Sequence, residues 1–385
     1  MRIRVALLLL CFTVQISPAS RGQAQTKDRV ERLLEELSNA PAPSGFEGRV
    51  REIVERELRA AGLEISSDGL GSVIGTLPGA SGGPRIMLAA HLDEVGGMVR
   101  YITPEGMVKF QLLGGWLDQA LPDQRWTILT WKGPLTALSG LPSPHITPRG
   151  EFERVIPRDE IFLDVGARSK AEAEALGVRA GDGVAPASSF ARLAGGRYIG
   201  KAMDDRVGCV VLIETLRRLK EQGIRLPNSA CFVGTVQEEV YLRGAHTAVQ
   251  AVKPDLGISL EAGLAADHPG GKPERAQERL GGGPTIYLAD AAMLINLKLR
   301  DFILRVAAEN HIPVQTEVTE GGAEDCAELQ RFDTGKPAFN LAVPARYLHN
   351  HNSMIERRDL DGAVDLLVKL LPLLDAQRVA EISRF

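Results

Sequence analysis

Short apolar runs alternate along this chain with segments that have helical spacing. The runs 85–90 and 230–234 carry no helical period, which predicts two buried strands. Three later segments, 255–261, 312–318 and 337–343, predict further strands. The chain therefore returns to extended structure at intervals over most of its length.

Helical segments separate these strands. Residues 27–40 place Val30, Leu33, Leu34 and Leu37 on one face, and the pair Ser44 and Glu47 has the spacing of a capping box that opens a second helix. Further helices are predicted at 204–223, 297–310 and 359–376. Alternating strands and helices indicate an α/β fold, with a mixed, mostly parallel sheet flanked by helices.

The stretch 98–198 has a different character. It is rich in glycine and proline, has short apolar runs and has few helical segments. We interpret it as a small β-rich domain inserted into the α/β domain, which then consists of 26–97 and 199–385.

The first 25 residues have the pattern of a secretory signal peptide. Arg2 and Arg4 precede an apolar run from Val5 to Ile16, and small residues follow it. The run is shorter than the roughly 20 residues that a membrane span needs. The pattern favours a signal peptide at 1–25 over an uncleaved anchor or a lipoprotein at Cys11, and it predicts an exported protein, periplasmic or extracellular.

Composition excludes several function classes. The net charge of −4 provides no basic surface for nucleic acid, and no membrane partner is expected after signal cleavage. Four widely spaced cysteines, with no Cys-x-x-Cys, indicate neither a disulfide framework nor a structural zinc site.

Ionisable side chains gather where the predicted strands end. His91 follows one strand, Glu238 and Glu239 follow a second, Glu261 ends a third, and His349 lies just past a fourth. Ligands of open α/β sheets bind outside the carboxyl ends of the strands, so we expect these groups to converge.

Asp204 and Asp205 open the helix at 204–223 and join this set. Imidazoles together with carboxylates form a zinc-type ligand set, and two ions need about six ligand bonds, which five residues supply if one carboxylate bridges. Adjacent carboxylates can then divide the work, one binding metal and its neighbour acting as general base. Each motif alone also occurs as a surface turn, a helix start or a polar loop.

At these residues the sequence resembles the tetrahedral and glutamyl aminopeptidases, metallopeptidase family 42, which are co-catalytic di-zinc exopeptidases. The resemblance covers the chain from about residue 27 to its end. The matching segments, in family order, are APSGFEGRV, AAHLDEVGGMV, IFLDVGARSKAEAEALGVRAGD, GKAMDDRVG, TVQEEVYLRGAHTAV, AADHPG and PARYLHN.

The resemblance implies a set of five metal ligands. Asp204 would bridge two divalent metal ions, His91 and Glu261 would complete one site, and Glu239 and His349 would complete the other. Zinc is the expected metal, and the same ligands suit cobalt or manganese.

The resemblance also implies the remaining roles. Glu238 would be the general base, and Asp93 would hydrogen-bond the His91 imidazole and fix its orientation. The stretch 98–198 would be the family's β-barrel domain, which serves contacts in a homo-oligomer, and relatives form dodecamers. The expected function is an exported metallo-aminopeptidase that hydrolyses peptide bonds at the N-terminus of peptides.

Three positions depart from the family pattern. Glu261 replaces the usual aspartate, Tyr241 replaces a glycine whose backbone a tyrosine is not expected to adopt, and Ser353 stands where a glutamate is usual. Because of Glu261, a di-metal dipeptidase or deacylase stays an alternative, and so does a non-catalytic metal-binding homologue. His351, two residues after His349, is expected at the rim of the site.

Overall fold

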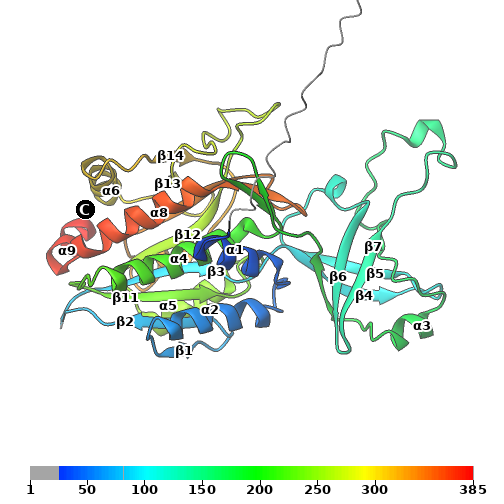
Figure 1. Cartoon of the computed structure of the whole chain (residues 1–385), viewed down its shortest axis with the longest axis horizontal. Coiled ribbons are helices and arrows are strands. Elements are labelled where there is room, and N and C mark those ends of the chain that lie inside the picture. The colour runs from blue at the N-terminus through cyan, green and yellow to red at the C-terminus, as the bar shows by residue number, and fades with distance from the viewer. Residues whose placement is uncertain (1–25, 81, 385) are drawn as a thin grey trace, which may run out of the picture.

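The computed structural model describes residues 26–80 and 82–384, and the expected signal peptide at 1–25 lies outside these residues. Figure 1 shows two bodies, a large sheet covered by helices and a smaller sheet that projects from one end of it. The predicted alternation of strands and helices is confirmed in the larger body. None of the helices in the described part of the chain is long and apolar enough to cross a membrane.

Eleven strands of the described residues form the large sheet, in the order β1-β2-β11-β3-β12-β15-β16-β10-β9, with β13 pairing with β14 and β15. At its centre β11, β3, β12 and β15 run parallel. The strands are β1 (Ile65–Ser67), β2 (Val73–Leu77), β3 (Arg85–His91), β9 (Ala191–Leu193), β10 (Arg197–Gly200), β11 (Ser229–Thr235), β12 (Leu256–Leu264), β13 (Thr285–Ala289), β14 (Gln315–Val318), β15 (Ala338–Arg346) and β16 (Ser353–Glu356).

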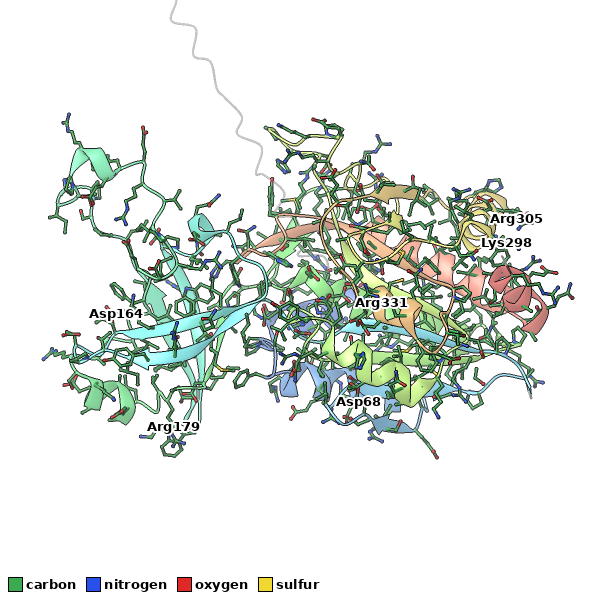
Figure 2. The ribbon with its side chains drawn as sticks, turned by 180° about the vertical axis from the view of Figure 1, so that it is seen from behind. Asp68, Asp164, Arg179, Lys298, Arg305 and Arg331 are labelled. Carbon is green, nitrogen blue, oxygen red and sulfur yellow. The ribbon has the colours of Figure 1, made fainter. Side chains whose placement is uncertain are left out.

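Helices cover both faces of this sheet. On one face α4 packs on β3 and β12 and against α1 and α8. On the other face α5 and α7 pack together, and α5 lies in front in the reverse view of Figure 2. The helices are α1 (Arg29–Asn39), α2 (Gly48–Ala60), α3 (Lys170–Ala175), α4 (Met203–Glu221), α5 (Arg243–Val252), α6 (Leu297–Glu309), α7 (Cys326–Arg331), α8 (Arg357–Leu370) and α9 (Ala376–Ser383). Central strands covered on both faces bury nearly all of their side chains, which explains their apolar runs.

One local prediction is wrong. Ser44 and Glu47 do not form a capping box at the start of α2, since Glu47 makes no side-chain cap bond. The Ser44 hydroxyl instead donates to Asp93, and the Glu47 carboxylate accepts from the backbone N–H groups of Gly45 and Gln237. The Ser44 hydroxyl therefore bonds to a residue distant in the sequence instead of capping the helix.

The smaller body is a five-stranded antiparallel sheet with its own apolar core. Its order is β5-β4-β8-β6-β7, from β4 (Gly96–Ile102), β5 (Val108–Leu113), β6 (Gln124–Thr130), β7 (Gly133–Ser139) and β8 (Gly183–Pro186). Trp126 is fully buried at its centre, and its indole N–H donates to Ser139 Oγ at 2.9 Å. Although 98–198 also contains β9 and the start of β10, these two strands belong to the large sheet.

Candidate metal centre

The side chains expected at the strand ends do lie together, at the edge of the large sheet that faces the smaller one. His91 is the last residue of β3, Glu238 and Glu239 follow β11, and His349 follows β15. Glu261 differs slightly from expectation, because it lies within β12 and that strand continues to Leu264. The parallel register of these strands brings their carboxyl ends to one place.

Asp204 lies between the two histidines. Its Oδ1 is 2.9 Å from His91 Nε2, and its Oδ2 is 3.3 Å from His349 Nε2. His349 Nε2 is also 3.5 Å from Glu239 Oε2. One carboxylate thus presents an oxygen to each imidazole, which is the arrangement that a bridging ligand requires.

The other two carboxylates approach His91 from the far side. Glu238 Oε2 is 3.8 Å and Glu261 Oε2 is 3.9 Å from His91 Nε2. Potential ligand atoms gather within 4.8 Å of one another in two groups, one of His91, Asp204 and Glu239 and one of His91, Asp205 and Glu261.

Asp93 has a wider role than the sequence suggested. Its Oδ1 is 3.5 Å from His91 Nδ1, and its carboxylate also accepts the backbone N–H groups of Glu238 and Glu239 at 2.9 and 3.2 Å. A single buried carboxylate therefore contacts the first histidine and holds the backbone of the turn after β11.

Burial perturbs the acids of this cluster. It raises the pKa of Glu239 to about 7 and holds the pKa values of Glu238 and Glu261 well above their usual range. Burial alone lowers the pKa of His349, but the nearby carboxylates Glu239 and Asp204 outweigh it and raise that pKa to about 10. The site therefore gathers carboxyl and imidazole groups whose pKa values are shifted by burial and by one another.

Two buried carboxylate oxygens of the cluster have no hydrogen-bond partner in the described structure. They are Glu239 Oε1 and Glu261 Oε2. Leaving such atoms buried and unpaired is costly, and a bound cation is the partner that carboxylate oxygens and imidazole nitrogens share. The residues present therefore fit divalent metal ions.

Sequence reasoning missed Glu324 and Asp325, and it gave Asp205 no role of its own. Asp205 accepts the backbone N–H groups of His91 and Gly208 through its two oxygens. Glu324 and Asp325 come from the loop before α7, and burial raises their pKa values to about 8 and 6. These two acids lie six and seven residues after the end of β14 and not directly at the strand end, so the strand pattern did not single them out.

A cavity of about 630 Å³ opens onto the cluster, and its lining includes Asp204, Glu238, Glu239, Glu324 and His349. Tyr241 lies at its margin with 91% of its surface exposed and a φ of 76°. The expectation that tyrosine cannot adopt this backbone is wrong. The left-handed region is open to it at a cost of about 1–2 kcal/mol, and in solvent the ring meets no obstruction.

His351 is also placed differently from expectation. It is buried rather than at the rim, and its ring lies 4.4 Å from that of Trp126 and 5.6 Å from that of Trp116, centroid to centroid. Burial lowers its pKa to about 4. It contacts the smaller sheet and not the carboxylate cluster.

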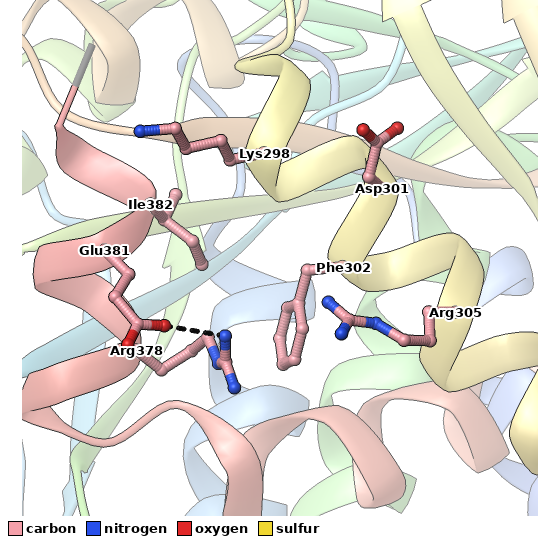
Figure 3. Close-up of a pocket in the computed structure, with 7 residues that line it drawn as sticks. All are labelled: Lys298, Asp301, Phe302, Arg305, Arg378, Glu381 and Ile382. Atoms are coloured by element: carbon pink, nitrogen blue, oxygen red, sulfur yellow. Dashed lines mark hydrogen bonds and ion pairs between the residues drawn. The ribbon is translucent and has the colours of Figure 1, made fainter.

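A second pocket, shown in Figure 3, lies between α6 and α9. The guanidinium groups of Arg305 and Arg378 lie 5.8 and 5.0 Å from the centre of the Phe302 ring, and Arg378 is paired with Glu381. Cations concentrated in this way repel a metal ion, so the carboxylate cavity is the better candidate centre.

Known proteins that are similar to this chain include aminopeptidases. The model of the family M42 glutamyl aminopeptidase matches residues 71–366. Putative aminopeptidase FrvX of Escherichia coli is 35% identical over 92% of this chain and 98% of its own length. The glutamyl aminopeptidase of Lactococcus lactis is 32% identical over 91% of this chain and 98% of its own length. The lysyl aminopeptidase of Pyrococcus furiosus is 33% identical, over 88% of this chain and 96% of its own.

Solved structures of similar chains support the fold. A TET aminopeptidase from the marine sediment archaeon Thaumarchaeota archaeon SCGC AB-539-E09 superposes with a TM-score of 0.89 at 38% identity, covering 92% of this chain and all of that one. The TET1 peptidase of Pyrococcus horikoshii, which can assemble into a tetrahedron or a large octahedral shell, has a TM-score of 0.81 at 30% identity, covering 89% of this chain and 99% of that one. The mixed, largely parallel α/β fold is thereby confirmed, while the closed barrel stays a prediction.

These comparisons correct one expectation and weaken another. The prediction of an exported protein is contradicted by the comparison with homologues such as the TET and FrvX peptidases. The dipeptidase or deacylase alternative suggested by Glu261 is not favoured, because the characterised relatives are named as aminopeptidases.

Proposed function

This chain belongs to the M42 glutamyl aminopeptidase family and is a metallo-aminopeptidase by that membership, and we propose the residues through which it acts. Two divalent ions would share Asp204, with His91 and Glu261 completing one site and Glu239 and His349 the other. The observation that carries this assignment is the Asp204 carboxylate, whose two oxygens face the two imidazoles. Zinc is the proposed metal, and cobalt and manganese fit the same ligands.

Divalent ions held there would supply Lewis-acid charge to the scissile carbonyl and to the attacking water. Glu238 lines the cavity beside these groups, and no metal role is assigned to it. Its Oε2 would take a proton from the water and return it to the leaving amine, as a general base and then a general acid. Asp93 and Glu47 support this chemistry by holding the backbone N–H groups of residues 237–239.

Peptide substrates would enter through the 630 Å³ cavity with a free α-amine directed to the carboxylate cluster. Divalent ions held there would bind a free amine through its nitrogen lone pair, which an acylated amine does not offer. Tyr241 and Leu264 at the margin would contact the residues of the peptide.

A panel of peptides tests this function. We expect free-amine peptides to lose residues one at a time from the N-terminus, N-acetylated versions to resist, and a chelator to abolish turnover until zinc or cobalt is added back. Release of the acetyl group, or cleavage confined to dipeptides, would instead identify a deacylase or a dipeptidase.

The assemblies of relatives support a homo-oligomer, and we propose a dodecamer. The inserted domain at 98–198 would make the subunit contacts, and the residues 26–97 and 199–385 would form the catalytic domain. The measured mass in solution by light scattering should then be about twelve times the 41.6 kDa of one chain. A mass of one or two chains at micromolar concentration would contradict it.

A further inference from the structure

The smaller sheet contacts the metal centre through one short segment, Gly114–Trp116, which leaves the end of β5. Figure 1 shows this sheet projecting from one end of the large sheet. An insertion used only for subunit contacts would not need to touch the candidate ligands. The segment Gly114–Trp116 does touch them.

Gly115 contacts His349 directly. Its carbonyl oxygen is 2.7 Å from His349 Nδ1. A carbonyl can only accept a hydrogen bond, so Nδ1 must carry the proton. In the neutral imidazole, Nε2, which faces Asp204 and Glu239, then keeps its lone pair, and that is the tautomer that a metal ligand needs.

The backbone of this segment also lies unusually close to the site. A Cβ added to Gly114 would lie 2.9 Å from Glu239 Oε2, and one added to Gly115 would lie 3.2 Å from His349 Nδ1. Side chains at these two positions would occupy the space of the two ligands. The glycines therefore let the main chain form one wall of the centre.

The loop that carries His349 is held by the same sheet. His351 inserts its ring beside Trp116 and Trp126, and Trp126 is itself fixed by Ser139. Asn352 accepts a hydrogen bond from Ser188, which follows β8. The loop backbone is in the left-handed region at both Tyr347 and His349, a conformation that persists only when surrounding contacts impose it.

We propose that Gly114–Trp116, anchored in the five-stranded sheet, is a positioning element that sets the tautomer and orientation of His349, while the contact of His351 with Trp116 and Trp126 holds the His349 loop in place. The inference rests on the proposed role of His349 as a metal ligand. It gives the inserted sheet a second task beyond subunit contacts, and that task concerns one metal site and not the other.

Titration of the metal-free full-length protein with cobalt, followed by its visible absorption, tests this. Gly115→Ala needs no strained backbone but crowds Nδ1, and His351→Ala empties the space between the tryptophans. Changes of this kind behind a ligand typically weaken metal binding by about 10- to 100-fold, so we expect that loss for one cobalt equivalent and none for the other. His351→Phe keeps a ring between the tryptophans and should bind both equivalents nearly as the parent protein does.

Gly140→Ala is the matched control, because a Cβ there meets nothing within 4 Å and the residue follows β7 of the same sheet. It should bind both equivalents normally. Normal binding in Gly115→Ala and His351→Ala would overturn the proposal, and so would equal weakening of both equivalents together with a lower unfolding temperature, or failure of His351→Phe to restore binding. His349→Ala serves as the reference, since full binding there would refute the ligand assignment itself.

Discussion

Replacing Glu238 by glutamine should stop turnover without removing metal. The amide keeps the shape of the side chain but accepts no proton at neutral pH, so kcat should fall by about 10²- to 10⁴-fold, the usual contribution of a general base. Substrate affinity should change little, because Glu238 is assigned no binding role. Metal-to-protein ratios measured on the purified variant, beside its kinetics, check both parts.

Glu239→Gln is the matched control for this experiment. It makes the same chemical change one residue away, but at a carboxylate 3.5 Å from His349 Nε2. It should therefore weaken metal binding, and added zinc or cobalt should restore part of its activity. Equal metal loss in the two variants, or full activity in Glu238→Gln, would show that the adjacent carboxylates do not divide proton transfer and binding.

His349→Ala should lose one of the two metal ions and nearly all activity. The ion it would help to hold contributes several kcal/mol of charge stabilisation in the transition state, so kcat/KM should fall by about 10³-fold or more. Metal analysis after dialysis, together with kinetics in excess zinc, measures both effects.

An exposed histidine elsewhere gives the control for His349. His145 lies in the segment after β7, far from the carboxylates in sequence and exposed to solvent. His145→Ala should keep both ions and parental activity. Two ions retained in His349→Ala would remove this residue from the ligand set and, with it, the argument from the Asp204 geometry.

The kinds of elements and most of the site could be predicted from the sequence. Buried strands such as β3 and β11 have unbroken apolar runs because helices cover both of their faces, and the run ends where the strand reaches the edge of the sheet. Parallel strands bring these ends together. Polar residues placed just after such runs, among them His91, Glu238 and His349, are therefore expected at that edge, and the strand order β11-β3-β12-β15 makes them neighbours.

Only the tertiary structure decided what supports these residues. Gly115 and His349 are 234 residues apart, and no periodicity or motif links a glycine after β5 with the tautomer of a histidine after β15. The same holds for Asp93, which accepts hydrogen bonds from the backbone N–H groups of Glu238 and Glu239. It also holds for Ser44, whose hydroxyl donates to Asp93 instead of capping the helix. Local sequence sets hydrophobic patterns, because those depend on burial of neighbouring residues. Hydrogen bonds between distant segments depend on how the whole chain packs, so the second layer of contacts around the candidate ligands could be read only from the fold.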